Sequence, residues 1–311
     1  MPKIITLTMN PVVQKDTAVA GIIPNTKLRC DPPVYDIGGG GINVSRVLKE
    51  LGSPSLCMHL SGGSTGDHLR QMIAMREITQ KAISIEDRTR DYLSVTDTLT
   101  NLQYRFGVPG PHVQKQEWEK VLTQLQESLQ KGDILVASGK LPQGVPSDFY
   151  IRVSKITDKN GAKLIIDTSG DALLPSKKAS IFMMKPNLKE FSILMGVESI
   201  SALHLDSLAK KFLTQNKCEV LVISLGAKGA LLATKEFVEY IPSPVVHQKT
   251  TIGTGDSMVA GMVYSLVQGK SLREMVHYGV ACGAAATMRS GTQFCNKYEV
   301  EDLYEWLKKN C

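Results

Sequence analysis

The chain contains 311 residues, of which 42% are hydrophobic and 21% are charged, and its formal net charge at pH 7 is +6. This length and hydrophobic content allow a sizeable core, in one large α/β domain or in two small ones. Because the charge is mild and the Lys and Arg residues are scattered, it favours anionic small molecules as ligands and argues against a nucleic-acid partner.

The cysteines and the apolar runs indicate where the protein works. Its six cysteines form no C-x-x-C pair and no metal-binding spacing, which favours reduced thiols in a cytoplasmic protein. No apolar run approaches the roughly 20 residues that span a bilayer, and the chain begins with a strand-like run rather than a targeting segment. We therefore expect a soluble, cytoplasmic protein without a membrane partner.

Short β-rich runs alternate along the chain with helical patterns. Strands are predicted at residues 4–8, 55–60, 134–138, 164–167, 181–184, 220–224 and 230–234. Helices are predicted at residues 116–131, 147–160, 188–195 and 206–215. Several of the strands are apolar on both faces, a pattern typical of a parallel sheet that helices cover on each side.

Four consecutive glycines at 38–41 precede a further helix. Apolar residues recur there at helical spacing, at Val44, Val47, Leu48 and Leu51, and Gly52 ends the pattern. Backbone without Cβ atoms lets a ligand approach closely, and the Asn43 side chain can both donate to and accept from sugar hydroxyls. A flexible loop before a helix is the alternative interpretation. The chain contains neither a G-x-G-x-x-G motif at this loop nor a P-loop.

Two segments, residues 12–37 and 88–107, interrupt this alternation. Polar and apolar residues alternate in them without a helical period, and 93–98 with 103–106 resembles a half-buried hairpin. We predict that the two segments pair into a small separate sheet over one edge of the main domain. Its apolar face needs a cover, either as a lid over a site or against a dimer partner.

The segment Thr251-Ile252-Gly253-Thr254-Gly255-Asp256-Ser257 carries the strongest chemical signal, because two glycines lead sharply into an apolar helix. Unpaired N–H groups at such a helix start bind anions. Asp256 stands beside them, and we expect the helix N-terminus to keep it ionised. An anion site next to a general base suits transfer of a phosphoryl group to a hydroxyl. A simple turn with Asp256 as its N-cap is the alternative.

Two further motifs follow strands at the edge where doubly wound sheets collect ligands. In Lys185-Pro186-Asn187-Leu188-Lys189-Glu190, the lysine can meet a phosphate and the glutamate can hold a Mg²⁺-bound water, although Asn187 also fits a helix cap. Ser224-Leu225-Gly226-Ala227-Lys228-Gly229 fits a ligand loop and a simple β-turn equally well.

Basic residues that could hold a substrate phosphate are Arg90, Lys27 and Arg29. The guanidinium fork of arginine matches a phosphate with two hydrogen bonds. Solvated surface charge is the alternative for all three.

Together these motifs resemble the ribokinase-like (PfkB) sugar kinases, in the same order and from Lys3 to about Leu307. Within this family the chain is most similar to the minor bacterial 6-phosphofructokinase subgroup. The resemblance implies an α/β fold with a three-layer, doubly wound, mostly parallel sheet. It also implies one kinase domain over residues 1–311, with lid segments at about 12–37 and 88–107 and a homodimer that forms through the lid sheet.

The resemblance also implies roles for individual residues. Asp256 would be the catalytic base, and the anion hole would consist of Gly253, Thr254 and Gly255. ATP would lie against Lys185, Asn187, Ser224, Gly226 and Gly229. The sugar phosphate would be held by Gln14, Gly38, Gly39, Asn43 and Arg90. Lys27 and Arg29 would reach the partner subunit's substrate site.

Metal ions are implied in the same way. Glu190 would organise Mg²⁺ through water, and K⁺ would be held near Thr250, Ile252, Ala286 and Gly291. Inhibition by a second ATP is a further implication. The expected reaction converts ATP and fructose 6-phosphate into ADP and fructose 1,6-bisphosphate. The alternatives are tagatose-6-phosphate kinase, 1-phosphofructokinase, and a sugar-phosphate-binding regulatory protein with weak catalysis.

Three positions depart from the family pattern. Gln14 stands where the family usually has an Asp that contacts sugar hydroxyls, and Asp16 lies two residues on. Because Gln is uncharged and can donate, we expect sugar recognition to differ here. Lys140 replaces a small polar residue near Ser138, where it either adds charge near the nucleotide phosphates or points outward. Thr254 replaces the usual Ala.

Overall fold

The computed structural model describes residues 2–289 and 294–310, and in it two sheets organise the chain. The larger sheet contains β1 (Ile4–Thr8), β4 (Leu56–Ser61), β5 (Gln80–Ser84), β8 (Ile134–Ser138), β9 (Lys163–Asp167), β10 (Ile181–Met184), β11 (Cys218–Ser224), β12 (Ala230–Ala233) and β13 (Val238–Ile241). Its strand order is β13-β12-β11-β10-β9-β8-β1-β4-β5. The strands run parallel except at the β11–β12–β13 edge, which is antiparallel.

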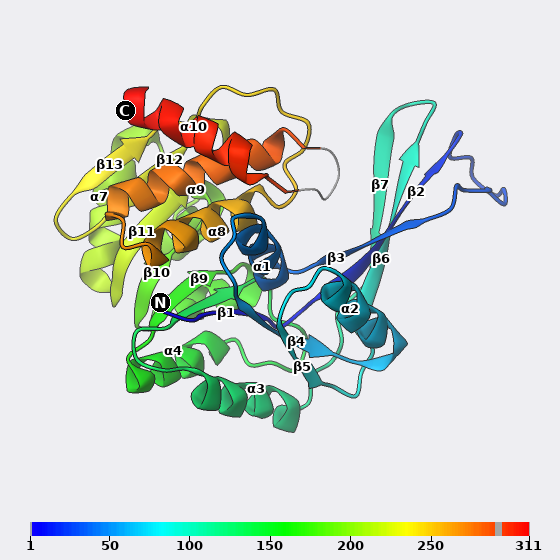
Figure 1. The fold of residues 1–311 in the computed structure, drawn as a ribbon, viewed down its shortest axis with the longest axis horizontal. Helices are drawn as coiled ribbons and strands as arrows, with labels where there is room; N and C mark the ends of the chain where they lie inside the picture. Colours follow the sequence, from blue (N-terminus) through cyan, green and yellow to red (C-terminus); the bar gives the residue numbers. More distant parts are fainter. Residues whose placement is uncertain (1, 290–293, 311) are drawn as a thin grey trace.

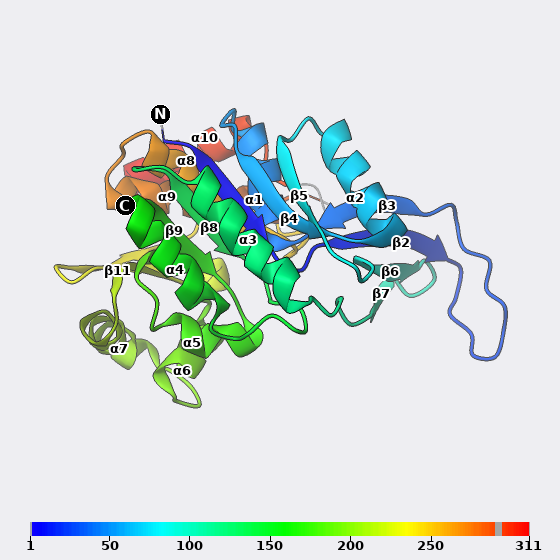
Figure 2. The same ribbon diagram turned by 90° about the horizontal axis from the view of Figure 1, so that it is seen from below.

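Helices cover both faces of this sheet (Figures 1 and 2). One face carries α3 (Lys115–Ser128), α4 (Phe149–Asn160), α5 (Leu173–Ser176), α6 (Leu188–Met195) and α7 (Ala202–Gln215). The other carries α1 (Gly40–Glu50), α2 (Gly63–Met75), α8 (Thr254–Val267), α9 (Leu272–Thr287) and α10 (Lys297–Asn310). Short 3₁₀ turns lie at Gly170–Ala172 and Gly226–Lys228. The predicted three-layer, doubly wound α/β fold is confirmed.

The strands of the larger sheet are apolar on both faces because each face packs into a separate hydrophobic core. In β8, Leu135 and Ala137 pack into the core under α3 and α4, whereas Ile134 and Val136 pack into the core under α1 and α8. Each predicted strand lies within two residues of an observed one. Sequence reasoning did not assign β5, β13, α2, α5, α9 or α10, and it began α7 four residues too late.

The smaller sheet has the strand order β3-β2-β6-β7 and is formed by β2 (Val12–Val19), β3 (Val34–Gly38), β6 (Arg90–Asp97) and β7 (Leu102–Gly107). The predicted pairing of the two irregular segments is confirmed, because β2 pairs with β6 in parallel. The β6–β7 hairpin is also confirmed, but β7 is exposed along its whole length and not half-buried as expected. As an outer strand it has neighbours on one side only. The sheet projects from the main body (Figure 1).

This small sheet has one polar and one apolar face, because paired residues share a face. Gln14 pairs with Tyr92, and Arg105 pairs with Ser94, so these polar side chains share one face. Val13 and Ile37 on the opposite face pack against α2. The alternation seen in the sequence therefore separates a polar surface from an apolar one. Among the described helices, none combines the length and apolar character needed to cross a membrane.

Candidate active site

The start of α8 is shaped by Gly253, which has a left-handed φ of 70°. A Cβ atom there would lie 2.3 Å from the Phe294 ring, so the ring packs directly on this glycine. The unpaired N–H groups of the first turn follow at Thr254 and Gly255, next to Asp256. Because Gly253 itself occupies the N-cap, the interpretation of Asp256 as an N-cap is wrong.

The Asp256 carboxylate is held from two other elements. Asn43 Nδ2 in α1 donates to Asp256 Oδ2 at 2.8 Å, and Ser138 Oγ at the end of β8 lies 3.5 Å from Asp256 Oδ1. Gly40 is required for this arrangement, because a Cβ atom there would lie 2.0 Å from Ser138 Oγ. The tetraglycine loop thus lets α1 approach β8 closely enough to place Asn43 on the carboxylate.

Burial raises the pKa of Asp256 to about 7, and the nearby charge of Asp167 adds to the effect. The hydrogen bonds from Asn43 and Ser138 and the charge of Lys185 act in the opposite direction. The expectation that the helix N-terminus keeps Asp256 fully ionised is therefore wrong. Desolvation outweighs the helix end, and the carboxylate titrates near neutral pH, where a general base is most effective.

Asp167 is a site residue that sequence reasoning missed. It ends β9, and its Oδ1 atom lies 3.3 Å from Lys185 Nζ. Lys185 is only 4% exposed, and its ammonium lies 3.5 Å from where a Cβ of Gly255 would stand. The Lys185 ammonium therefore lies beside the start of α8 as a buried cation. The signal for Asp167 was a carboxylate at the C-terminal end of a parallel strand.

Beyond Asp256, several buried polar atoms have no hydrogen-bond partner among the described residues. Three of them are Ser94 Oγ, Ser257 Oγ and His277 Nε2, and the other three, Asn10 Oδ1, Asn43 Oδ1 and Arg90 Nε, belong to the predicted sugar-binding residues or their neighbours. Arg90 begins β6, and its Nη2 atom lies 3.4 Å from the Asn10 carbonyl oxygen. Since buried polar groups are normally paired, these atoms indicate a ligand with hydroxyl and anionic groups. Gly38 and Gly39 lie beside them, and a Cβ on Gly39 would lie 2.6 Å from Thr8.

Gln14 is buried on the polar face of β2. Its Nε2 atom donates to both oxygens of Asp16, at 2.6 and 2.7 Å. Its Oε1 atom accepts from the Tyr92 hydroxyl. Tyr92, which sequence reasoning also missed, has its pKa raised mainly by burial. Gln14 therefore connects a carboxylate to a phenol, and Asp16 supplies the negative charge that position 14 lacks.

A pocket of about 300 Å³ opens next to the start of α8. The predicted residues Ser224, Gly226 and Gly229 line it together with Thr254 and Gly255. Pro244, Val245, Val246, Met258, Val280 and Ala284 supply its apolar wall. A small apolar pocket beside an anion-binding helix start fits a nucleobase joined to phosphates.

Gly229 has a left-handed φ of 99°, and a Cβ there would lie 2.0 Å from the Ile241 carbonyl oxygen. The turn interpretation of this loop is confirmed, because it connects β11 and β12. The loop also lines the pocket, and its role as a ligand loop stays a prediction.

The Lys185–Glu190 motif begins α6 and carries a carboxylate with a raised pKa. Asn187 caps α6 and forms a reciprocal capping box with Glu190, as the alternative interpretation expected. Burial raises the pKa of Glu190, and the charge of Asp167 adds to this. A carboxylate whose pKa is raised by a neighbouring carboxylate suits a divalent cation. Asn187 is bridged to Ser224, which brings this motif to the pocket beside the start of α8.

The residues expected at the K⁺ loop converge in part. Thr250 N lies 3.2 Å from the Thr287 carbonyl oxygen, and Ala286 lies at the end of α9, where carbonyl groups carry partial negative charge. Ile252 N donates to Thr250 Oγ1 at 3.1 Å. These contacts bring Thr250 and Ile252 to the end of α9, and the K⁺ site itself stays a prediction. The prediction for Gly291 lies outside the described residues.

Lys27 and Arg29 lie elsewhere. Both are exposed in the connection between β2 and β3, at the far end of the projecting sheet (Figure 2), whereas Arg90 lies at the start of β6 beside Asn10. Lys140 is exposed after β8, as expected if it points outward.

The comparisons with known proteins agree with this geometry. The model of the pfkB family carbohydrate kinases matches residues 4–298. The chain is 38% identical over 304 residues to ATP-dependent 6-phosphofructokinase isozyme 2 of Mycobacterium tuberculosis, which covers 98% of this chain and 89% of the relative. It is 36% identical over 311 residues to the Escherichia coli protein of the same name, with 99% of this chain and 100% of the relative covered.

Solved structures extend the agreement. Phosphofructokinase-2 from Escherichia coli in complex with potassium superposes with a TM-score of 0.94 at 35% identity, covering 99% of this chain and 100% of that chain. The complex of that enzyme with fructose-6-phosphate gives 0.91 at the same identity and coverage. The family model matches nearly the whole chain, and the two relatives are more than 30% identical to it, so these findings together show the family. This chain belongs to the PfkB family of carbohydrate kinases.

Proposed function

We propose that the chain is an ATP-dependent 6-phosphofructokinase, which transfers the γ-phosphoryl group of ATP to the 1-hydroxyl of fructose 6-phosphate and releases ADP and fructose 1,6-bisphosphate. The single observation that carries the proposal is Asp256, a carboxylate whose pKa is raised to about 7, at the anion-binding start of α8. The relatives that bear this enzyme name, and the fructose-6-phosphate complex of one of them, support the choice of sugar.

Asp256 accepts the proton of the sugar hydroxyl. The hydroxyl oxygen forms a bond to the γ-phosphorus atom, and the bond between that atom and the leaving oxygen of ADP breaks. Asn43 and Ser138 orient the carboxylate for this role. The N–H groups of Thr254 and Gly255, with the buried Lys185, stabilise the negative charge on the transferring group. The apolar wall of the adjoining pocket holds the nucleobase.

The sugar phosphate occupies the polar region around Arg90. The guanidinium binds the 6-phosphate, and the unpartnered oxygens of Asn10 and Asn43 accept from sugar hydroxyls. Gln14 and Asp16 contact hydroxyls from β2. Gly38 and Gly39 leave room for the sugar ring.

Two metal ions complete the proposal. Mg²⁺ would be held through water by Glu190, with Asp167 nearby, and would neutralise phosphate charge. K⁺ would be held by backbone oxygens near Thr250, Ile252 and Ala286. The named complex of the Escherichia coli enzyme with potassium supports this site.

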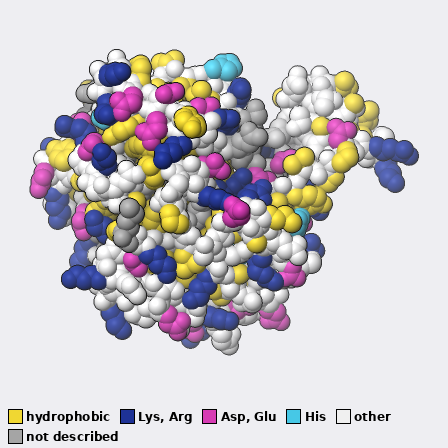
Figure 3. Space-filling model, in the orientation of Figure 1, with side chains coloured by type: hydrophobic (Ala, Val, Ile, Leu, Met, Phe, Trp, Pro, Cys, Tyr) yellow, Lys and Arg dark blue, Asp and Glu magenta, His cyan; other side chains and the backbone are white. Residues whose placement is uncertain are grey.

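We further propose that residues 1–311 form one kinase domain whose small sheet is a lid and a homodimer interface. Exposed apolar side chains on β7 and its neighbours support this, with Phe106 54% and Leu102 57% exposed. Figure 3 shows hydrophobic side chains along the projecting sheet and basic ones at its tip. In such a dimer Lys27 and Arg29 reach the partner subunit's substrate site. A cytoplasmic location fits this enzyme class.

Release of ADP by the purified protein with Mg-ATP and K⁺ tests the proposal. Fructose 6-phosphate, tagatose 6-phosphate, fructose 1-phosphate and unphosphorylated fructose are compared, with Asp256→Asn as the control for contaminating kinases. Strong turnover with fructose 6-phosphate is expected. Preference for tagatose 6-phosphate or fructose 1-phosphate would replace the sugar assignment, and binding without ADP formation would indicate a regulatory protein.

A further inference from the structure

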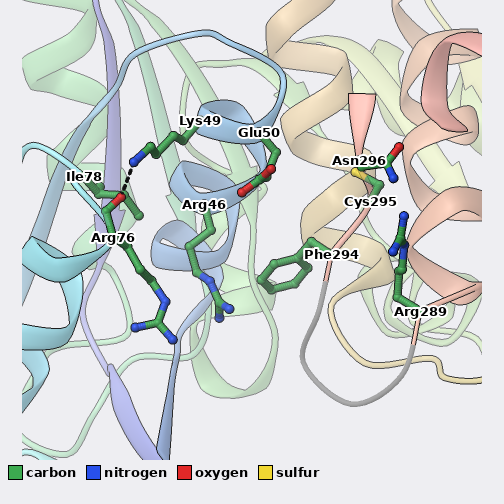
Figure 4. A pocket seen from close by; sticks show the side chains of 9 residues that line it. All are labelled: Arg46, Lys49, Glu50, Arg76, Ile78, Arg289, Phe294, Cys295 and Asn296. Carbon is green, nitrogen blue, oxygen red and sulfur yellow. Dashed lines mark hydrogen bonds between the residues drawn. The ribbon is translucent and has the colours of Figure 1, made fainter. Parts of the chain in front are cut away.

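The start of α8 is fixed through its backbone on one side. Phe294 lines a pocket of about 420 Å³ beside α1, where the Arg46 guanidinium lies 4.5 Å from the centroid of its ring (Figure 4). The same ring packs on Gly253, where a Cβ atom would lie 2.3 Å from it. This packing sets where α8 begins. It does not set the direction of the Asp256 carboxylate, which depends on side chains from other elements.

Ser138 makes the longer of the two contacts that hold this carboxylate. Its Oγ atom lies 3.5 Å from Asp256 Oδ1, whereas Asn43 Nδ2 lies 2.8 Å from Asp256 Oδ2. A separation of 3.5 Å is close to the upper limit of a hydrogen bond, so a small displacement of Ser138 breaks the contact. The orientation of the carboxylate is therefore sensitive to the turn that follows Ser138 at the end of β8.

That turn is held by hydrogen bonds from other elements. Gly139 has a left-handed φ of 105°, and its N–H group donates to the Asp167 carbonyl oxygen at 2.9 Å. Its carbonyl oxygen accepts from the Tyr150 hydroxyl of α4 at 3.1 Å and from the Thr168 hydroxyl after β9 at 2.9 Å. A carbonyl oxygen has two lone pairs, and donors from two separate elements use both of them. We call these two hydroxyl groups the Gly139 clamp.

Both donors of the clamp are shielded from water. Tyr150 is 1% exposed and Thr168 is 5% exposed. Burial raises the pKa of Tyr150, and the charge of Asp167 adds to this, so the phenol keeps its proton and remains a donor. Buried hydrogen bonds of this kind are stronger than exposed ones, and they make the turn rigid. Nothing in the proposed reaction uses either hydroxyl.

We propose that Tyr150 and Thr168 are positioning residues for phosphoryl transfer: by fixing the Gly139 peptide, they keep Ser138 within reach of the Asp256 carboxylate. Both hydroxyls act through the turn and not on the reacting atoms. The proposal rests on the proposed function, because it gives Asp256 the role of general base.

Tyr150→Phe and Thr168→Val each remove one hydroxyl of the clamp and nearly keep the shape of the side chain. Two matched controls remove a buried hydroxyl elsewhere. Tyr278 of α9 donates to Glu301 at 2.8 Å, and Thr157 of α4 donates to a backbone carbonyl oxygen at 2.9 Å. Tyr278→Phe and Thr157→Val therefore lose the same groups without touching the turn. Thermal melting checks that each variant is folded.

We expect each clamp variant to lower kcat about tenfold, which is less than the ~10²-fold cost of misplacing a catalytic group by about 1 Å, with the KM values for ATP and fructose 6-phosphate unchanged. The two controls should keep the turnover of the wild type. Steady-state ADP release measures all of these values. Wild-type kcat in both clamp variants, or an equal loss in the controls, would overturn the proposal.

A double-mutant cycle tests whether the clamp acts through Ser138. Ser138→Ala removes the hydroxyl that contacts Asp256. Adding Tyr150→Phe to it should cost little more, because the clamp then has no hydroxyl to position. A further loss as large as that of Tyr150→Phe alone would show that the tyrosine acts by another route, and would overturn the proposal.

The pH profile separates positioning from a general loss of structure. Burial and the charge of Asp167 raise the pKa of Asp256. The hydrogen bonds from Asn43 and Ser138 and the charge of Lys185 lower it. Weakening the Ser138 bond in the clamp variants raises this pKa, so the acidic limb of kcat/KM should move to higher pH. A reduced kcat with the limb at its wild-type pH would contradict the positioning role.

Amide hydrogen exchange at Gly139 tests the clamp without relying on turnover. Loss of one clamp hydrogen bond should speed exchange of the Gly139 N–H group about fivefold or more, with the two controls unchanged. Unchanged exchange in both clamp variants would overturn the proposal. Faster exchange in a protein that turns over none of the tested sugars would reject the kinase function, and the positioning role with it, while the clamp itself would stand.

Discussion

The side-chain amide of Gln14 donates to both carboxylate oxygens of Asp16, at 2.6 and 2.7 Å, on the polar face of β2. An uncharged residue at position 14 and a charged one at 16 thus act as one hydrogen-bonded unit. Tyr92 completes it from β6. We interpret the presence of Gln14, where the family usually has an aspartate, as a shift of the negative charge by two residues.

We predict that Gln14→Asp, although it introduces the family's usual residue, raises the KM for fructose 6-phosphate about tenfold. It places two carboxylates in contact and removes a hydrogen bond to a charged group. The double variant Gln14→Asp/Asp16→Asn reverses the polarity of the pair and should recover most of the loss. Steady-state kinetics measures both, with the KM for ATP as an internal control. Equal KM values in the single and double variants would show that the two positions are not coupled.

Asp256→Asn should keep ATP binding and reduce turnover by at least ~10²-fold, because the asparagine cannot accept the hydroxyl proton. ADP release and calorimetric titration with ATP measure the two effects. Asp206→Asn on the exposed face of α7 is the matched control. Turnover close to that of the wild type in pure Asp256→Asn protein would remove Asp256 from the role of general base.

The pH profile of kcat/KM should show an acidic limb near pH 7. Asp256 acts only when deprotonated, and burial with the charge of Asp167 raises its pKa to about 7, so activity rises as the pH passes this value. Asp167→Asn removes one of the two causes, and the limb should move to lower pH even if turnover falls. If the acidic limb stays at the same pH in Asp167→Asn, it reports the titration of a group other than Asp256.

Phe106→Asp should weaken self-association about tenfold or more, because it places a charge among the exposed apolar side chains of β7. Sedimentation velocity over a range of concentrations measures this. Leu203→Asp is the control, since Leu203 is 91% exposed on α7, away from the small sheet. Unchanged association of Phe106→Asp would move the interface elsewhere.

Gly253→Ala should destabilise the fold more than Gly196→Ala. Both glycines have a φ near +70°, which costs an alanine about 1 kcal/mol, but a Cβ at Gly196 meets nothing within 4 Å, whereas one at Gly253 overlaps the Phe294 ring. Chemical denaturation should show a loss at Gly253 about twice as large, with reduced turnover in that variant alone. Equal losses would mean that the ring moves aside at no cost.

The sequence by itself determined the layers of the fold. Strands such as Ile134–Ser138 are apolar on both faces and can be stable only between two layers of helices. Gly52 ends the first helix where the apolar spacing ends, and the alternating segments at 12–37 and 88–107 pair as their period requires. The glycine loops and Asp256 were also visible, because local backbone chemistry marks them.

Only the tertiary structure decided which distant residues share the site. Asp167 became a partner of Lys185 because parallel strands bring their C-terminal ends together, and Tyr92 reached Gln14 because the register of β2 and β6 sets them opposite. Local sequence carries no record of such register. The pKa of Asp256 was mispredicted for the same reason, since desolvation depends on what the whole fold places around a carboxylate and not on its position in one helix.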